Sequence, residues 1–268
     1  MDLARRFGGI SRLYGAAGYE KLRRARIAVA GLGGVGSWAA EALARSGVGS
    51  ITLIDLDHVA ESNANRQIHA LGDEFGKAKV LAMAERIALI NPWARTLCVE
   101  EFVTPDNVQA LIRDVDVVID CIDQVSAKAA LIAHARRLGM GVVTCGAAGG
   151  RIDPTRIRCD DLARALGDPL LSKVRYRLRR DYQFPRAAAG RSGGGAGARL
   201  PRFGVPAVFS DEPVRTALVE AGPADSGEAP ERTAGAPLAC AGYGSTVVLT
   251  APLGFAAAAR ALDWILAA

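Results

Sequence analysis

Short strand-like runs alternate with longer amphipathic stretches through the first 150 residues of this chain. Five runs have the length and character of buried strands, at 26–31, 51–55, 95–102, 115–120 and 141–145. The stretches between them place apolar residues at helical spacing, at 34–46, 77–90, from 105 and at 127–138. This alternation predicts an α/β, doubly wound, Rossmann-like and mostly parallel sheet, with its cleft at the carboxyl ends of the strands.

The pattern is less regular after residue 150. Residues 161–181 are predicted to be helical and become increasingly basic, and the low-complexity run at about 186–200 is typical of a flexible linker. Two further strands, at 207–210 and 246–249, are predicted to return to the sheet. We therefore expect one domain over 1–268, made of an N-terminal arm (1–25), a nucleotide-binding core (26–150) and a smaller basic extension that binds the substrate (151–268).

The composition favours a globular protein of a reducing compartment. Half of the 268 residues are hydrophobic and 23% are charged, so a large core is easily formed. The five cysteines are spread along the chain without a Cys-x-x-Cys pair, which argues against a disulfide framework and a structural zinc site. The first 12 residues have no apolar segment, so we expect no secretory signal and a cytoplasmic location.

One uncharged stretch, 235–259, is long enough to suggest a transmembrane segment. It contains two prolines and several glycine, serine and threonine residues, and it runs into Arg260 and Asp263. A strand and turn followed by an apolar helix fits this composition better. We therefore do not expect contact with a membrane.

The positive charge is concentrated in one segment. The chain has a formal net charge of +5, and residues 173–202 contain nine Lys or Arg residues and a single acid, Asp181. Such a segment indicates a polyanionic partner, of which nucleic acid is the commonest. The candidate contacts are Lys173, Arg175, Arg177, Arg179 and Arg180, although a solvated helix face would have the same composition.

A glycine-rich turn follows the first predicted strand. Gly31, Gly33, Gly34 and Gly36 allow a tight strand-to-helix turn whose backbone N–H groups point at phosphate oxygens. Asp55 ends the second strand 24 residues after Gly31, where a carboxylate accepts hydrogen bonds from ribose hydroxyls. These features alone fit a nicotinamide cofactor as well as ATP.

Four polar residues behind the turn favour ATP. Arg66, close to Asn63, can neutralise the charge that builds on a departing pyrophosphate. Lys79, near the start of the following helix, can reach a phosphate or a developing oxyanion, although a solvated helix face is the alternative. Asp123 follows a predicted strand and can hold magnesium against the phosphates. Asp120, in the last turn of that strand, is interpreted as structural.

At these residues the chain resembles a known superfamily, the ubiquitin-activating-enzyme-like adenylating enzymes. The resemblance rests on the glycine turn, Asp55, Asn63-Ala-Asn-Arg66-Gln67, Lys79, Ile90-Asn-Pro92 and Asp120-Cys-Ile-Asp123. It implies ATP and magnesium as cofactors, with Asp55 on the ribose, Arg66 and Lys79 on the phosphates and Asp123 on the metal. Members adenylate a carboxylate and release pyrophosphate.

Five further stretches resemble one family within it, the tRNA threonylcarbamoyladenosine dehydratases. They are 6–15, 65–70, 102–107, 149–155 and 168–173. This resemblance implies that the partner is tRNA carrying threonylcarbamoyladenosine, whose threonyl carboxylate is adenylated and then attacked by its own carbamoyl group, so that a ring closes. It also implies a homodimer in which an arginine near the N-terminus, Arg6 or Arg12, reaches ATP in the neighbouring subunit.

Three other functions stay open at this point. Enzymes that activate a sulfur carrier or a ubiquitin-like protein pass the acyl adenylate to a thiol, and here Cys240 is the candidate thiol, with a sulfur-transfer protein as partner. Those relatives often carry asparagine after the magnesium aspartate and two Cys-x-x-Cys pairs, whereas this chain has Gln124 and neither pair. The alternative for Cys240 is a buried structural role. The two other functions are a nicotinamide-dependent oxidoreductase and a non-catalytic RNA adaptor that senses a nucleotide.

Overall fold

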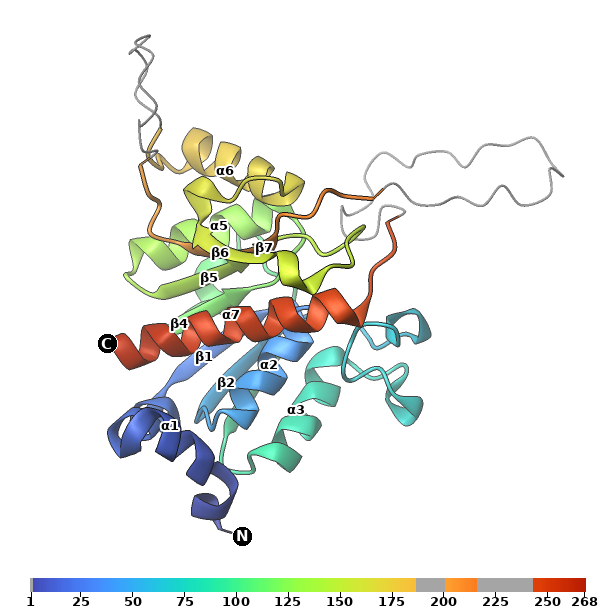
Figure 1. Cartoon of the computed structure of the whole chain (residues 1–268), viewed down its shortest axis with the longest axis vertical. Helices are drawn as coiled ribbons and strands as arrows, with labels where there is room; N and C mark the ends of the chain where they lie inside the picture. Colours follow the sequence, from blue (N-terminus) through green and yellow to red (C-terminus); the bar gives the residue numbers. More distant parts are fainter. Residues whose placement is uncertain (1, 187–200, 216–242) are drawn as a thin grey trace, which may run out of the picture.

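A computed structural model describes residues 2–186, 201–215 and 243–268, and a seven-stranded sheet runs through its centre (Figure 1). The strands lie in the order β3-β2-β1-β4-β5-β7-β6. Their bounds are Arg26–Ala30 (β1), Ser50–Ile54 (β2), Arg95–Val99 (β3), Val117–Asp120 (β4), Gly141–Cys145 (β5), Ile157–Asp161 (β6) and Pro206–Ser210 (β7). All pairs are parallel except β6–β7, so the predicted doubly wound α/β fold is confirmed.

Helices cover both faces of the sheet. They are α1 (Leu3–Arg24), α2 (Gly36–Arg45), α3 (Lys79–Ile90), α4 (Val108–Leu111), α5 (Val125–Arg137), α6 (Pro169–Asp181) and α7 (Val247–Ala267). Successive side chains of a strand point to opposite faces, so Ile27 and Val29 of β1 pack with α2, α3 and α7, while Ala28 and Ala30 pack with α5 and α6. The strand order reverses between β1 and β4, and such a switch point is where open α/β sheets bind ligands.

Two predicted segments differ from the structure. Residues 246–249 were expected to form a strand, but Thr246 is the N-cap of α7 and its hydroxyl accepts a hydrogen bond from the Val248 N–H. Residues 161–181 were expected to be continuously helical, but they contain the end of β6 and a short 3-10 helix before α6 begins at Pro169. The flexible linker expected at about 186–200 lies almost wholly outside the described residues.

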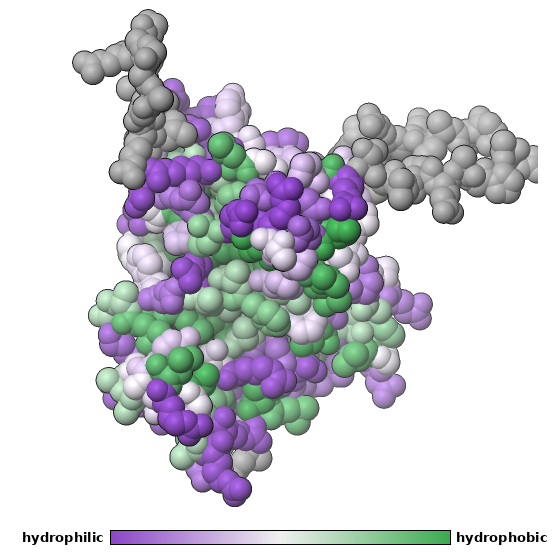
Figure 2. All heavy atoms as spheres, in the orientation of Figure 1, coloured by the Kyte–Doolittle hydropathy of each residue, from purple (hydrophilic) through white to green (hydrophobic). Residues whose placement is uncertain are grey.

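The apolar helix α7 is a core helix. It is long and apolar enough to cross a membrane, but more than half of its apolar window is buried inside the protein. A Cβ atom at Gly254 would lie 2.5 Å from the Val35 carbonyl oxygen, which shows how closely α7 approaches α2. Figure 2 shows apolar side chains along the face where α7 runs. Burial thus explains the hydropathy of α7: the expected apolar helix is confirmed, whereas the strand expected before it is not.

A fully buried ion pair holds the carboxyl end of β4. The Lys128 Nζ lies 2.9 Å from Asp120 Oδ2 and also donates to the Asp120 carbonyl oxygen at 3.1 Å. The Thr144 hydroxyl of the next strand donates to the same carboxylate at 2.7 Å. Separating the members of a buried pair would leave an uncompensated charge, so each member holds the other in place. The network thereby fixes the loop that follows β4. The structural role expected of Asp120 is confirmed.

The buried His69 generates a prediction about pH. His69 is 2% exposed, and neither of its ring nitrogens has a hydrogen-bond partner in the described part of the chain. Burial, together with the positive charges of Lys79 and Arg86, lowers the pKa of His69 to about 4. The folded state therefore favours the neutral ring, while the unfolded state takes up a proton below its ordinary pKa of about 6.5.

The His69 contribution to stability is therefore complete above about pH 6.5 and is lost as the pH falls toward 4. As the pH falls over that interval, we expect the free energy of unfolding to decrease by about 3 kcal/mol because of His69. Urea titrations of the wild type and of His69→Gln across this range measure the difference between the two pH profiles. Parallel profiles would contradict the prediction.

Candidate functional site

The glycine turn lies at the switch point, between β1 and α2. Gly31 has φ +87°, and a Cβ atom there would lie 3.0 Å from the Cys121 carbonyl oxygen. A Cβ atom at Gly36 would collide with the Gly31 carbonyl oxygen at 1.8 Å. The N-cap residue of α2, Val35, has no side-chain oxygen to accept from the first turn. The Ser37 N–H donates to the Gly33 carbonyl oxygen at 3.1 Å, whereas the Gly36 and Trp38 N–H groups have no partner among the described residues and are available to an anion. Space beside Gly33 is open.

Asp55 lies directly after β2 and next to this turn. Its Oδ2 accepts from the Leu32 N–H at 2.6 Å, and its Oδ1 accepts from the Asp57 N–H at 2.9 Å. Burial raises the pKa of the Asp55 carboxyl, and the nearby Lys79 cation opposes that shift. Since each carboxylate oxygen has a second lone pair, the fixed group can still accept from ribose hydroxyls.

Arg66 packs against the glycine turn. Its Cγ would lie 3.2 Å from a Cβ atom at Gly34, and its guanidinium donates to the Ser62 carbonyl oxygen and to Asn65 Oδ1. Asn65 in turn donates to the Ser245 carbonyl oxygen at 2.7 Å, which ties this segment to the start of α7. Among the described residues no carboxylate pairs with Arg66, so its positive charge is available to a phosphate.

Asn63 has a local structural role in addition to any ligand contact. It ends a short 3-10 helix, is 8% exposed, and accepts from the Ala60 N–H through Oδ1 at 3.1 Å. This bond shapes the segment that carries Arg66. The Asn63 carbonyl oxygen also accepts from the Arg66 N–H at 3.0 Å, so Asn63 supports the backbone at Arg66 directly.

Lys79 is held where α3 begins. Its side chain is 6% exposed, and its Nζ lies 2.8 Å from Asp57 Oδ2, whose own side chain is 54% exposed. The solvated-face alternative for Lys79 is therefore wrong, because the side chain is buried and directed at the acidic residues after β2. Asp57 was missed by the sequence analysis. Its position two residues after Asp55, at the same strand end, was the available signal.

Asp123 is a free carboxylate in the loop between β4 and α5, at the switch point. It is partly exposed, and within the described ranges it makes no hydrogen bond or ion pair. It lies two residues after Cys121, whose carbonyl oxygen contacts the glycine turn. Magnesium is commonly held by one or two carboxylates together with substrate phosphates, and a single free carboxylate fits that arrangement. No cluster of three or more metal-ligating side chains occurs in the described part of the chain.

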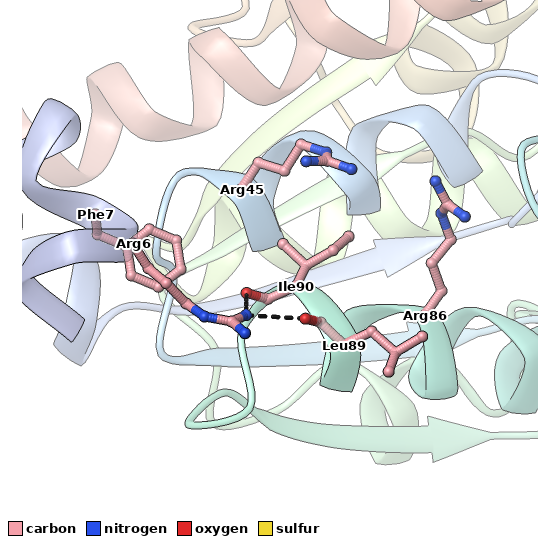
Figure 3. A pocket seen from close by; sticks show the side chains of 6 residues that line it. All are labelled: Arg6, Phe7, Arg45, Arg86, Leu89 and Ile90. Atoms are coloured by element: carbon pink, nitrogen blue, oxygen red, sulfur yellow. Dashed lines mark hydrogen bonds between the residues drawn. The ribbon is translucent and has the colours of Figure 1, made fainter. Parts of the chain in front are cut away.

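The two N-terminal arginines have different surroundings. The Arg6 guanidinium donates to the carbonyl oxygens of Leu89 and Ile90, at the end of α3, beside a cavity of about 450 Å³ (Figure 3). Arg45, the last residue of α2, lines the same cavity. The glycine turn lies at the other end of α2, about 15 Å away for a helix of this length. Both arginines are exposed, but Arg6 is bonded locally, whereas the Arg12 side chain makes no hydrogen bond within the described residues.

The basic residues of α6 fall into two groups. Arg175 is buried, and its guanidinium donates to the Ala165 carbonyl oxygen, so its expected role in binding RNA is wrong. Burial lowers the pKa of the Arg175 guanidinium. Arg179 lies over the Phe203 ring, with its guanidinium carbon 5.1 Å from the ring centroid. Lys173, Arg177 and Arg180 line a cavity beside the start of α5.

Three of the four cysteines in the described part of the chain have a raised thiol pKa, which makes them poor nucleophiles. The Sγ atoms of Cys121 and Cys145 lie 3.7 Å apart at the ends of neighbouring strands. This contact and burial raise the pKa of the Cys121 thiol well above its ordinary value. Burial also raises the pKa of Cys98 and of Cys159. Cys240, the candidate thiol of the alternative function, lies outside the described residues.

A second fully buried cation, Arg151, lies in the loop after β5. Arg151 is fully buried and donates to the carbonyl oxygens of Ala147, Gly167 and Glu212, and to Asp168 Oδ2 at 3.2 Å. Asp168 is also the N-cap of α6. Arg151 therefore joins the loop after β5 to the basic helix. Sequence reasoning found the segments around both residues but not the contact between them.

The comparisons with known proteins agree with this geometry. The model of the family described as "ThiF family" matches residues 6–169. The tRNA threonylcarbamoyladenosine dehydratase of Escherichia coli (strain K12) is 47% identical over 98% of this chain and 94% of its own length. The protein of the same name from Haemophilus influenzae is 42% identical over 97% of this chain and 93% of its own length.

A solved structure extends the likeness to three dimensions. The crystal structure of the E. coli tRNA N6-threonylcarbamoyladenosine dehydratase in complex with ATP has a TM-score of 0.81 and 44% identity to this chain. The match covers 98% of this chain and 95% of the E. coli chain. Because the family model matches more than half of the chain, and because the E. coli relative is 47% identical over 98% of it, the chain belongs to the ThiF family.

Proposed function

We propose that this chain is an ATP-dependent tRNA threonylcarbamoyladenosine dehydratase. The observation that supports it best is the meeting of the glycine turn, the unpaired Arg66, the buried Lys79 and the free Asp123 at one switch point. A nicotinamide cofactor would not use these two cations. The dehydratases that are 47% and 42% identical to nearly the whole chain supply the substrate class.

In the first step, a threonyl carboxylate oxygen attacks the α-phosphorus of ATP and pyrophosphate leaves. The N–H groups at the start of α2 bind phosphate oxygens, and Asp55 holds the ribose. Arg66 and Lys79 stabilise the negative charge that grows on the leaving pyrophosphate and on the α-phosphate. Magnesium, held by Asp123 and the phosphates, would neutralise further charge there.

In the second step, a nitrogen or oxygen of the same carbamoyl group attacks the activated carbonyl carbon. AMP leaves with one carboxylate oxygen, a nitrogen of the carbamoyl group loses a proton, and the ring closes with a net loss of water. Since the nucleophile belongs to the same molecule, its effective concentration is high once it is oriented. This step requires no cysteine of the enzyme.

We further propose a cytoplasmic homodimer. The N-terminal arm is the helix α1, and its Arg12 is exposed and free of the local bonds that hold Arg6. Arg12 is therefore the better candidate to reach ATP in the neighbouring subunit. The residues of α6 that line its cavity, namely Lys173, Arg177 and Arg180, are the proposed tRNA contacts, and Arg179 is a weaker candidate because it packs on Phe203.

The reaction is tested by pyrophosphate release. We expect release from ATP and magnesium with tRNA carrying threonylcarbamoyladenosine and none with unmodified tRNA. Mass spectrometry of the nucleosides should show the loss of one water. Absence of release with the modified tRNA would contradict the proposed function.

Substitution of the two central residues should abolish turnover without unfolding the protein. We expect Lys79→Ala and Asp123→Ala each to lower kcat about 10²-fold or more, because each removes charge stabilisation from the transition state. Lys77→Ala is the matched control, since this lysine lies two residues earlier and pairs with Glu74 and Glu85 at the surface. Circular dichroism and urea titration verify the fold, and turnover comparable to that of Lys77→Ala would refute the assigned roles.

The thiol-transfer alternative depends on Cys240. We expect Cys240→Ser to retain full pyrophosphate release and full formation of the cyclic nucleoside, because the second step is intramolecular. Rate measurements with modified tRNA test this directly. Loss of cyclisation, with adenylation intact, would favour an enzyme that passes its acyl group to a thiol.

The proposed tRNA contacts predict a dependence on salt. Each phosphate contact that is removed lowers the slope of log K against log salt by about 1. We therefore expect Lys173→Ala and Arg177→Ala to weaken tRNA binding and to reduce this slope. Arg95→Ala, at the opposite edge of the sheet, is the control and should leave the slope unchanged. Equal slopes for all variants would exclude α6 as the tRNA contact.

A further inference from the structure

The exposed face of α6 carries an aromatic ring among its cations. Tyr176 is 64% exposed. Lys173 lies one helical turn before it and Arg180 one turn after it, and Arg177 is its neighbour in the chain. The guanidinium carbon of Arg180 is 5.5 Å from the centroid of the Tyr176 ring. The opposite face of α6 is buried through Leu171, Val174 and Leu178, so the orientation of this row of side chains is fixed by the core.

A cavity of about 290 Å³ lies between this face and the start of α5. It is lined by Val125, Ser172, Lys173, Tyr176, Arg177 and Arg180. Val125 is the first residue of α5 and comes two residues after Asp123. The cavity therefore borders the loop that carries the free carboxylate of the cleft. A ligand that fills it lies next to the place where the carboxylate substrate is activated.

We propose that Tyr176, supported by Arg180, is a stacking platform for a nucleobase next to the modified adenosine of the tRNA substrate. This inference rests on the proposed function and names a binding site for the flanking nucleotide. A base stacks on the accessible part of the tyrosine ring, and the Lys173 ammonium and the Arg177 guanidinium bind its phosphates.

The chemistry of the cavity favours a single-stranded nucleotide over an acidic peptide. Arg177 and Arg180 each pair with Asp181, at 3.1 Å and 2.6 Å, so the group that distinguishes between ligands is the exposed Tyr176 ring and not the cations. One face of this ring lies under the Arg180 guanidinium, and the other face offers stacking to a base but nothing to a peptide carboxylate. Bases in a duplex are stacked and unavailable, whereas those of an RNA loop can be splayed onto an aromatic side chain.

The platform acts on binding rather than on the chemical step. Tyr176 lies on α6, whose N-cap is Asp168, and Asp168 is tied through Arg151 to the loop after β5. A base held there orients the neighbouring modified adenosine toward the ATP site. Interactions that are equal in the ground state and the transition state change KM and leave kcat unchanged.

The test compares Tyr176→Leu with Tyr176→Phe, which keeps the ring. We expect Tyr176→Leu to raise the KM for modified tRNA about 10-fold, with kcat and the KM for ATP unchanged, and Tyr176→Phe to resemble the wild type. Trp93→Leu is the control, because Trp93 is an exposed aromatic residue just before β3, at the amino end of the strands. An anticodon stem-loop RNA with 2-aminopurine beside the modified adenosine gives a direct readout of stacking.

Quenching of the 2-aminopurine fluorescence by the wild type and Tyr176→Phe, but not by Tyr176→Leu, supports the platform. An unchanged KM and unchanged quenching in Tyr176→Leu overturn it, even if the enzyme is an active dehydratase. If the wild type releases no pyrophosphate with modified tRNA, the proposed function fails and the platform fails with it. The pyrophosphate assay thus separates the two.

Discussion

The contact between the glycine turn and the loop after β4 is the constraint on which the rest of the site depends. Gly31, at positive φ, approaches the Cys121 carbonyl oxygen so closely that a Cβ atom would lie 3.0 Å from it. This contact puts the phosphate-binding end of α2 and the loop carrying Asp123 side by side. The glycine is required both for the backbone conformation and for the space. Without it, the glycine turn and the loop that carries Asp123 would separate.

The distribution of charge around this contact follows one physical rule. Cations that are fully buried have partners: Lys128 with Asp120, and Arg151 with Asp168 and three carbonyl oxygens. The charges that face the cleft are less completely compensated, since Arg66 has only neutral partners and Asp123 has none among the described residues. A buried charge must be paired, whereas a charge that awaits a ligand must stay accessible. ATP and magnesium would use these accessible charges together with Lys79, which is buried and pairs with the exposed carboxylate of Asp57.

Much of the core was predictable because its determinants are local. The strands at 26–31 and 141–145 and the helices that start near residues 36 and 79 follow from apolar periodicity and from glycine and proline positions within a few residues. The segment 246–249 was predicted wrongly. Its Val-Val-Leu run has the composition of a strand, but Thr246 caps a helix there and α7 gains more by packing closely on α2 through Gly254.

The sequence by itself determined the doubly wound fold, the phosphate-binding turn and the set of polar residues that follow its strands, because each depends on residues close together in the chain. Only the tertiary structure decided which charges are buried and which are free. Arg175 and Arg177 are the same residue type two positions apart. Arg175 is buried and donates to the Ala165 carbonyl oxygen, whereas Arg177 lines the cavity beside α5. Such differences depend on segments that are far apart in the chain, as the Arg151 bond to Glu212 illustrates. Burial is a property of the packed molecule, and no local pattern contains it.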